Sequence, residues 1–160
     1  FWNILKGEKT IKETINHIGV VDTIIAHSVG SFCSLYFFDQ NPTLQPRQMV
    51  SLATAGKVHD FINEVKRMLS LTDREIDNLR SYFVSFTGKD PDYLDIENFF
   101  TNIKIKALLI HDEDDPDTDV NYSRRLHDLF DESELLITNG LGHKLRSKDV
   151  LQRVVNFVTN

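Results

Sequence analysis

The pentapeptide Ala26-His27-Ser28-Val29-Gly30 constrains the fold more than any other segment of the chain. It stands between an apolar run that ends at Ala26 and a second apolar run that begins at Phe32. The residues two positions before and after the serine, Ala26 and Gly30, are small, as a crowded turn between a strand and a helix requires. Such a turn lifts the serine clear of the sheet and directs the helix N-terminus to the space beside it. The segment therefore predicts a strand, a sharp turn and a helix, with Ser28 at the apex.

Short apolar runs alternate with helical patterns along the rest of the chain. Strands are expected at 20–26, 48–53, 104–111 and 134–138, and helices at 9–18, 31–38, 58–69, 122–130 and 148–158, with a further helix between a Thr72–Glu75 capping box and Gly88. The alternation favours an α/β fold, a parallel sheet with helices on both faces. The first run, 20–26, is apolar almost throughout, which is typical of a strand buried on both faces.

One domain is expected to span residues 1–160, because no linker or repeat divides them and the length suffices for one core. Residues 57–100 are mostly helical and interrupt the alternation. They are either a lid over a site or an extended crossover between strands. The chain opens at Phe1 rather than Met, in a segment typical of a helix end. We therefore expect a partial domain that belongs to a longer protein.

Composition excludes several classes of partner. The formal net charge is -6, and no cluster of Lys and Arg is longer than two residues. Neither nucleic acid nor an anionic membrane surface suits such a chain. The apolar runs are far shorter than the roughly 20 residues of a membrane span. Cys33 is the only cysteine, which rules out an internal disulfide or a cysteine-based zinc site and favours a reducing, cytoplasmic compartment.

Ser28 and His143 are the candidate nucleophile and base. A serine hydroxyl is a weak nucleophile until a base accepts its proton, and a serine at this position can instead simply cap the helix. His143 ends the segment Asn139-Gly140-Leu141-Gly142-His143, directly after the strand at 134–138. The glycines let the backbone turn, and open α/β sheets build their sites at the carboxyl ends of strands. We expect His143 to face Ser28 there.

The acid partner is expected in the acidic segment His111–Asp119, which follows the strand at 104–111. Any of its carboxylates could orient a histidine, and most of them belong to a solvated loop. Asp115, Asp117 and Asp119 also imitate a calcium loop, but the glycine and the glutamate that such a loop needs are absent from it. We therefore predict no metal site.

Four other residues with reactive or charged side chains have structural interpretations. His27 is expected to point away from Ser28 along the turn and to act as a packing residue. Cys33 lies in an apolar helix and is assigned to the core. Lys144 and Arg146, which flank His143, are assigned to solvent rather than to an anionic substrate group.

Together these segments resemble the α/β-hydrolase family, in particular its serine esterases. The pentapeptide around Ser28 is similar to the family's nucleophile elbow, with Ala26 in place of the first glycine, and the segment that ends at His143 is similar to its histidine loop. The family's acid lies four residues after the histidine that ends its strand, which selects Asp115. Asp114 stays a rival, because the loop from Asp115 to Val120 is longer than is usual in the family.

The resemblance also implies an oxyanion hole. The backbone N–H of Val29, the residue after the nucleophile, would supply one donor. The family's first strands, and the loop that supplies its second donor, have no counterpart in this chain. Losing one donor costs on the order of 100- to 1000-fold in turnover. We therefore expect an α/β-hydrolase-like fold without its N-terminal strands.

The function expected from this resemblance is that of a serine hydrolase. It would cleave a carboxylic ester or a related acyl substrate through an acyl-enzyme, with Ser28, Asp115 and His143 as the triad and with no cofactor. Esterase, lipase, thioesterase and peptidase activities all stay open. The alternatives are a non-catalytic binding module and an inactive fragment of a longer hydrolase. An open sheet edge in such a fragment would favour self-association.

Overall fold

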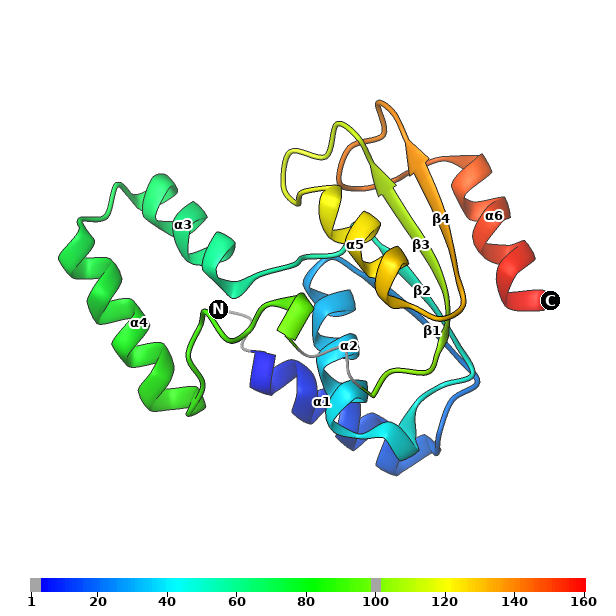
Figure 1. Ribbon diagram of the computed structural model, residues 1–160, viewed down its shortest axis with the longest axis horizontal. Coiled ribbons are helices and arrows are strands. Elements are labelled where there is room, and N and C mark those ends of the chain that lie inside the picture. The colour runs from blue at the N-terminus through cyan, green and yellow to red at the C-terminus, as the bar shows by residue number, and fades with distance from the viewer. Residues whose placement is uncertain (1–3, 99–101) are drawn as a thin grey trace.

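Four parallel strands form the sheet in the described part of the computed structural model, residues 4–98 and 102–160 (Figure 1). The strands are β1 (Thr23–His27), β2 (Gln48–Leu52), β3 (Lys106–Asp112) and β4 (Ser133–Thr138). They lie in the order β1-β2-β3-β4, and each neighbouring pair is parallel. All four carboxyl ends therefore meet at the same edge of the sheet, as the sequence predicts.

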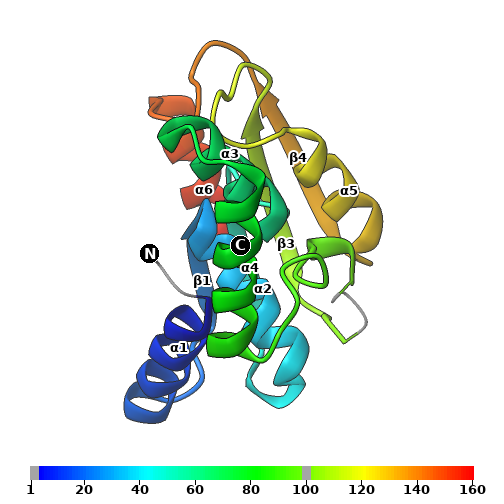
Figure 2. The ribbon, with the colours of Figure 1, turned by 90° about the vertical axis from the view of Figure 1, so that its left-hand side faces the viewer.

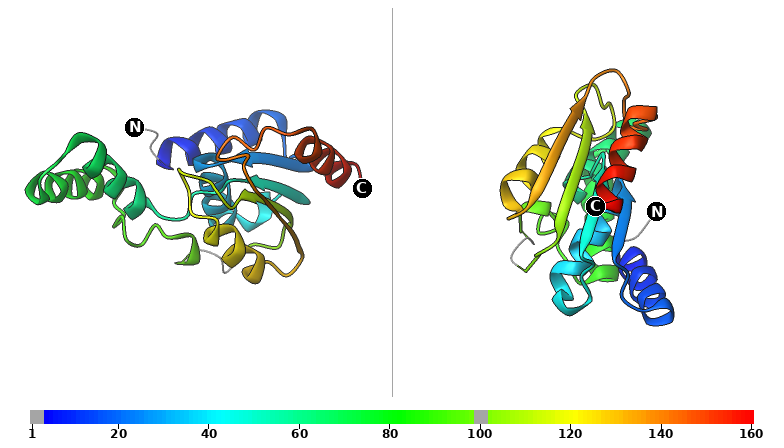
Figure 3. Two further views of the ribbon diagram at one scale, coloured as in Figure 1. Left: turned by 90° about the horizontal axis from the view of Figure 1, so that it is seen from above. Right: turned by 90° about the vertical axis from the view of Figure 1, so that its right-hand side faces the viewer.

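Helices cover both faces of this sheet. The helices are α1 (Ile4–Ile18), α2 (Val29–Gln40), α3 (Val58–Leu69), α4 (Asp73–Thr87), α5 (Asn121–Leu129) and α6 (Lys148–Thr159), with short 3-10 turns at Pro42–Leu44 and Ile96–Asn98. Along β3, Ala107 and Leu109 pack into the core under α2 and α5, whereas Leu108 and Ile110 pack under α6. Figure 3 shows α5 and α6 on opposite sides of the sheet. The predicted α/β architecture is confirmed.

Helix α2 is buried on almost all sides. Its apolar run from Phe32 to Phe38 has no polar face, and Phe37 and Phe38 are fully buried. On its outer side α2 is covered by α1, whose Ile11 and Ile15 join the same core. The burial fixes α2, and with it the turn at the helix N-terminus that carries Ser28.

Strand β1 differs from the prediction. The sequence predicts a strand at 20–26 that is buried on both faces, but β1 is an edge strand and its Ile25 is 55% exposed. Within residues 4–98 and 102–160, β1 pairs only with β2. Helix α6 packs over β3 and leaves the Ile25 side of β1 uncovered. The apolar run was therefore a poor guide to burial.

The segment between β2 and β3 folds into the helices α3 and α4, which project from the body of the sheet (Figures 1 and 2). The predicted capping box at the start of α4 is present, with Thr72 and Glu75 bonded reciprocally. Ile62 and Ile76 anchor the two helices to the core. Residues 99 and 100 of the predicted lid segment, and residues 1–3 of the predicted domain, lie outside the described residues.

No helix in the described segments is long and apolar enough to cross a lipid bilayer. The longest of them, α1 and α4, have 15 residues each. A bilayer core requires about 20 apolar residues in a helix.

Candidate active site

Ser28 occupies the sharp turn between β1 and α2. Its backbone has φ 55° and ψ -126°, a conformation that is rare for residues other than glycine and costs about 1–3 kcal/mol. Backbone hydrogen bonds hold it there. The Ser28 N–H donates to the Leu52 carbonyl at 2.8 Å, and the Ser28 carbonyl accepts from the N–H groups of Ser31, Phe32 and Ala55 at 3.0, 3.3 and 3.4 Å. The side chain makes no capping hydrogen bond to α2, so the helix-cap interpretation is wrong.

The loop after β4 carries His143 to the same edge of the sheet. Gly140 and Gly142 adopt positive φ values of 77° and 59°, which glycine tolerates at little cost. The loop is tied to the end of β3 by two carboxylates. Asp112 Oδ2 accepts from the Leu141 N–H at 3.0 Å, and Asp114 Oδ2 accepts from the Gly140 N–H at 3.2 Å.

Asp112 is a structural anchor that the sequence analysis missed. Its side chain is fully buried, and its Oδ2 also accepts from Thr138 Oγ1 at 2.6 Å. Burial alone would raise the pKa of this carboxyl, but the hydrogen bonds from Thr138 and the Leu141 backbone outweigh it and lower the pKa. The sequence did offer one signal. Asp112 ends β3, and the loop with Gly140 and Gly142 follows the neighbouring strand β4.

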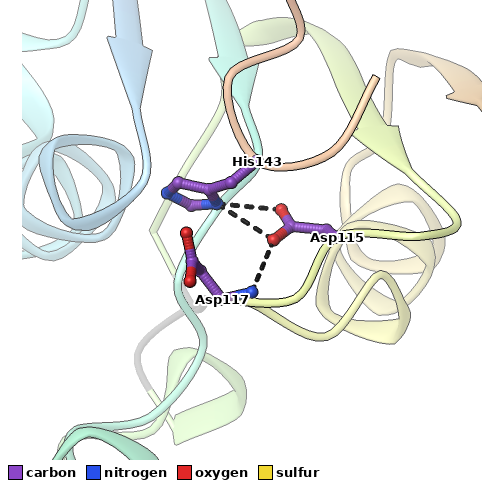
Figure 4. Close-up of side chains that lie close together, drawn as sticks. All are labelled: Asp115, Asp117 and His143. Atoms are coloured by element: carbon purple, nitrogen blue, oxygen red, sulfur yellow. Dashed lines mark hydrogen bonds and ion pairs between the residues drawn. The ribbon is translucent and has the colours of Figure 1, made fainter. Parts of the chain in front are cut away.

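Ser28, His143 and Asp115 lie in one hydrogen-bonded line. The Nε2 of His143 lies 3.0 Å from Ser28 Oγ. Its Nδ1 bonds the Asp115 carboxylate (Figure 4), 2.9 Å from Oδ2 and 3.1 Å from Oδ1. The Asp115 side chain is fully buried and that of His143 is 16% exposed. Asp114, the rival acid, contacts the backbone of the loop instead of the imidazole. The structure thus brings together all three residues that the sequence selected.

The Asp115 carboxylate is held rigidly by the turn that follows it. Its Oδ1 accepts from the backbone N–H of Asp117 at 2.8 Å and of Thr118 at 3.1 Å. Its Oδ2 accepts from Thr118 Oγ1 at 2.9 Å. Burial opposes the charge on Asp115, but the hydrogen bonds from His143, Asp117 and Thr118 prevail and lower its pKa. The group is therefore an ionised acceptor facing the imidazole.

His27 contacts the site, contrary to the prediction that it points away along the turn. Its Nε2 donates to the backbone carbonyl of His143 at 2.8 Å, and the two imidazole rings meet edge to face at 4.7 Å. The residue before Ser28 thus braces the loop that carries His143. The contact joins positions 116 residues apart, and position next to Ser28 was the only signal in the sequence that could have indicated it.

Asp115, Asp117 and His143 also have the residue types of a metal site. One ligand atom from each lies within 4.8 Å of the others (Figure 4). The imidazole of His143 and the carboxylate of Asp115 already bond each other through Nδ1 and Oδ2. A metal ion there would have to displace the contact between the imidazole and Asp115, and Asp117 is exposed. The cluster is therefore part of the Ser28 site, and we assign no separate metal centre to it.

The first turn of α2 faces this site with its amide groups. Val29 begins the helix directly after Ser28. N–H groups in the first turn have no intrahelical acceptor, and the helix dipole adds a partial positive charge there. An anionic oxygen bound next to Ser28 would therefore meet a favourable local field.

A parallel sheet covered on both faces, with a strained serine at a strand-to-helix turn, defines an α/β hydrolase. The chain belongs to the serine hydrolase (FSH1) family, whose model matches residues 2–153. Family membership and fold together support a hydrolase function. No curated protein sequence matches the chain.

Solved structures show the same fold. MGS-MChE2, an α/β hydrolase enzyme from the sediment metagenome of the lagoon of Mar Chica, Morocco, is 15% identical with a TM-score of 0.69, over 98% of this chain and 69% of that one. The putative non-heme bromoperoxidase BpoC from Mycobacterium tuberculosis H37Rv is 15% identical with a TM-score of 0.69, over 99% and 74%. The esterase EaEST from Exiguobacterium antarcticum is 12% identical with a TM-score of 0.66, over 98% and 73%.

Proposed function

We propose that the chain is a serine hydrolase that cleaves a carboxylic ester or a related acyl substrate through an acyl-enzyme. One observation carries this proposal: the continuous line of hydrogen bonds from Asp115 through His143 to Ser28, with contacts of 2.9 Å and 3.0 Å. Family membership supports the hydrolase class, and the solved esterase is a structural neighbour. The carboxylic ester is the simplest substrate that this arrangement can attack.

In the first half-reaction, Ser28 Oγ attacks the carbonyl carbon while His143 Nε2 accepts the hydroxyl proton. The carbonyl oxygen becomes an oxyanion, to which we assign the Val29 N–H as a donor. Asp115 accepts a hydrogen bond from Nδ1, which keeps Nε2 free as the base and stabilises the imidazolium that forms. The imidazolium then donates its proton to the leaving alcohol, and the acyl group stays on Ser28.

In the second half-reaction, water replaces the alcohol. His143 Nε2 accepts a proton from the water as its oxygen attacks the acyl carbon. Collapse of the second tetrahedral intermediate breaks the bond to Ser28, and the imidazolium returns its proton to Ser28 Oγ. The products are a carboxylic acid and the regenerated enzyme, so the cycle requires no cofactor.

We further propose that α3 and α4 act as a lid that selects the substrate. Ile62 on α3 and Ile76 on α4 pack into the core, and Asp60 on α3 accepts a hydrogen bond from the Tyr122 hydroxyl on α5. Apolar side chains on the lid are exposed, including Phe61, Met68 and Phe86. Such a surface favours an acyl substrate with an apolar chain over a charged one.

Ester hydrolysis tests the proposed activity. The assay follows release of p-nitrophenol from p-nitrophenyl acetate by the wild-type chain and by the variants Ser28→Ala and Ser133→Ala. Ser133 begins β4, at the opposite edge of the sheet from Ser28, and is the matched control. We expect turnover by the wild type and by Ser133→Ala, and none above background by Ser28→Ala. Folded wild-type protein without turnover would favour a non-catalytic binding module.

The open edge of β1 supports a proposal about self-association. In residues 4–98 and 102–160 no strand pairs with the outer edge of β1, and Ile25 is exposed on the adjoining face of the same strand. Unpaired strand edges associate with other chains. We expect sedimentation velocity to show concentration-dependent dimers that Ile25→Lys abolishes, and a monomer at all concentrations would contradict this.

We also propose a cytoplasmic location, since the single cysteine, Cys33, is a buried thiol.

A further inference from the structure

A second histidine lies beside the candidate acid, and the mechanism above does not use it. His111, near the end of β3, has a fully buried side chain. Its Nδ1 lies 2.7 Å from Ser123 Oγ, and its Nε2 lies 3.2 Å from the Thr118 carbonyl oxygen. The same Nε2 lies 3.2 Å from Oδ2 of Asp115, the oxygen that faces His143.

The surroundings of His111 determine which nitrogen carries its proton. Three oxygens lie beside Nε2. The Thr118 carbonyl and the Asp115 carboxylate only accept hydrogen bonds, and the Thr118 hydroxyl, 3.2 Å away, donates its own proton to Asp115 Oδ2. The proton is therefore on Nε2, and Nδ1 accepts from the Ser123 hydroxyl. Burial lowers the pKa of His111, which keeps the ring neutral.

We propose that His111 is a positioning residue for the hydrolytic reaction, a neutral N–H donor that fixes the turn and the carboxylate of Asp115 in the orientation that His143 requires. The proposal rests on the assigned function of that site. Through the Thr118 carbonyl, His111 holds the turn whose N–H groups bind Asp115 Oδ1. Because the ring is neutral, it supplies no positive charge to compete with the imidazolium of His143 for the same carboxylate.

The chain offers a conservative variant and a matched control for this proposal. Glutamine at position 111 extends an amide N–H about as far as Nε2, whereas leucine fills the space without a donor. His127 on α5 has the same local pairing, with Nδ1 2.7 Å from Ser133 Oγ, but contacts none of the three residues of the proposed triad. The variants are therefore His111→Leu, His111→Gln and His127→Leu.

Steady-state ester hydrolysis separates positioning from folding. We expect His111→Leu to lower kcat about tenfold with KM unchanged, as loss of one supporting hydrogen bond implies. His111→Gln should recover kcat to within about threefold of wild type, and His127→Leu should change neither parameter. A folded His111→Leu variant with the kcat of the wild type would overturn the proposal.

A nitrogen NMR spectrum of the wild-type chain, labelled at histidine, tests the same inference without activity. We expect His111 to carry its proton on Nε2 in the wild type and to keep it there in Ser123→Ala, because both acceptors beside Nε2 remain in that variant. A proton on Nδ1 in the wild type would overturn the proposal. This test uses the wild-type chain, so it holds even if His111→Leu does not fold. Wild-type chain that shows the expected tautomer but hydrolyses no ester would instead contradict the proposed function.

Discussion

Replacing Asp115 by asparagine should turn Nε2 of His143 from a proton acceptor into a proton donor, while a side chain of the same size stays at position 115. In the wild type, Asp115 Oδ1 accepts from the backbone N–H groups of Asp117 and Thr118, at 2.8 Å and 3.1 Å. These two donors keep the asparagine oxygen at the Oδ1 position and place its NH₂ group at Oδ2. That position lies 2.9 Å from His143 Nδ1. Nδ1 must then accept a hydrogen bond, which moves the ring proton to Nε2.

A proton on Nε2 faces Ser28 Oγ and prevents His143 from accepting the serine proton. The equivalent change in a Ser-His-Asp triad costs about 10⁴-fold in kcat, which corresponds to about 5 kcal/mol of transition-state stabilisation. We expect a loss of that order for Asp115→Asn in the p-nitrophenyl acetate assay. KM should change little, because Asp115 is fully buried and does not face the substrate.

Asp114→Asn is the matched control for this prediction. It makes the same change one residue away, where the carboxylate bonds the Gly140 N–H. Its kcat should fall at most a few-fold, because the amide oxygen of asparagine still accepts from the Gly140 N–H and only the charge is lost. A kcat of Asp115→Asn within tenfold of wild type, or an equal loss in Asp114→Asn, would refute the assignment of the acid.

Three predictions concern stability and pH. Thr72→Ala removes the capping box of α4 and should lower stability by about 1 kcal/mol, or the melting temperature by about 2–4 °C; an unchanged melting temperature would contradict it. Gly56→Ala places a Cβ against the ring carbons of Tyr122 and should cost about 1–3 kcal/mol in a denaturant titration, whereas unchanged stability would show that the ring moves freely. The pKa of Asp112 is lowered from 3.8 in the folded state, so its stabilising effect is present above that pH and is lost as the pH falls through the folded value. Thermal melts should therefore show a steeper acid destabilisation in wild type than in Asp112→Asn, and parallel curves would refute this.

Patterns local in sequence predicted most of the fold. The Thr72–Glu75 capping box, the apolar run that forms β3 and the spacing that forms α3 each depend on residues within one turn or one strand. The meeting of Ser28 with His143 was also predictable, because parallel strands end at one edge and both residues follow strand ends.

The remaining features depend on contacts between distant segments. Exposure of Ile25 follows from the position of β1 at the sheet edge, which its own apolar sequence does not encode. The contact of His27 with the His143 carbonyl and the anchoring of the loop by Asp112 require the packed positions of three loops. His111 is similar, since its partner Ser123 lies on the following helix. Residue types alone assigned His27 to packing and Asp112 to a solvated acidic loop.

Labelling with a fluorophosphonate probe, followed by mass spectrometry of the modified peptide, tests the central claim most directly. The probe forms a stable bond only with a serine whose proton a base accepts. We predict modification of Ser28 in the wild-type chain and its loss in His143→Ala, where Ser28 is retained but its base is absent. Absence of labelling in folded wild-type protein, or labelling at a different serine, would contradict the account.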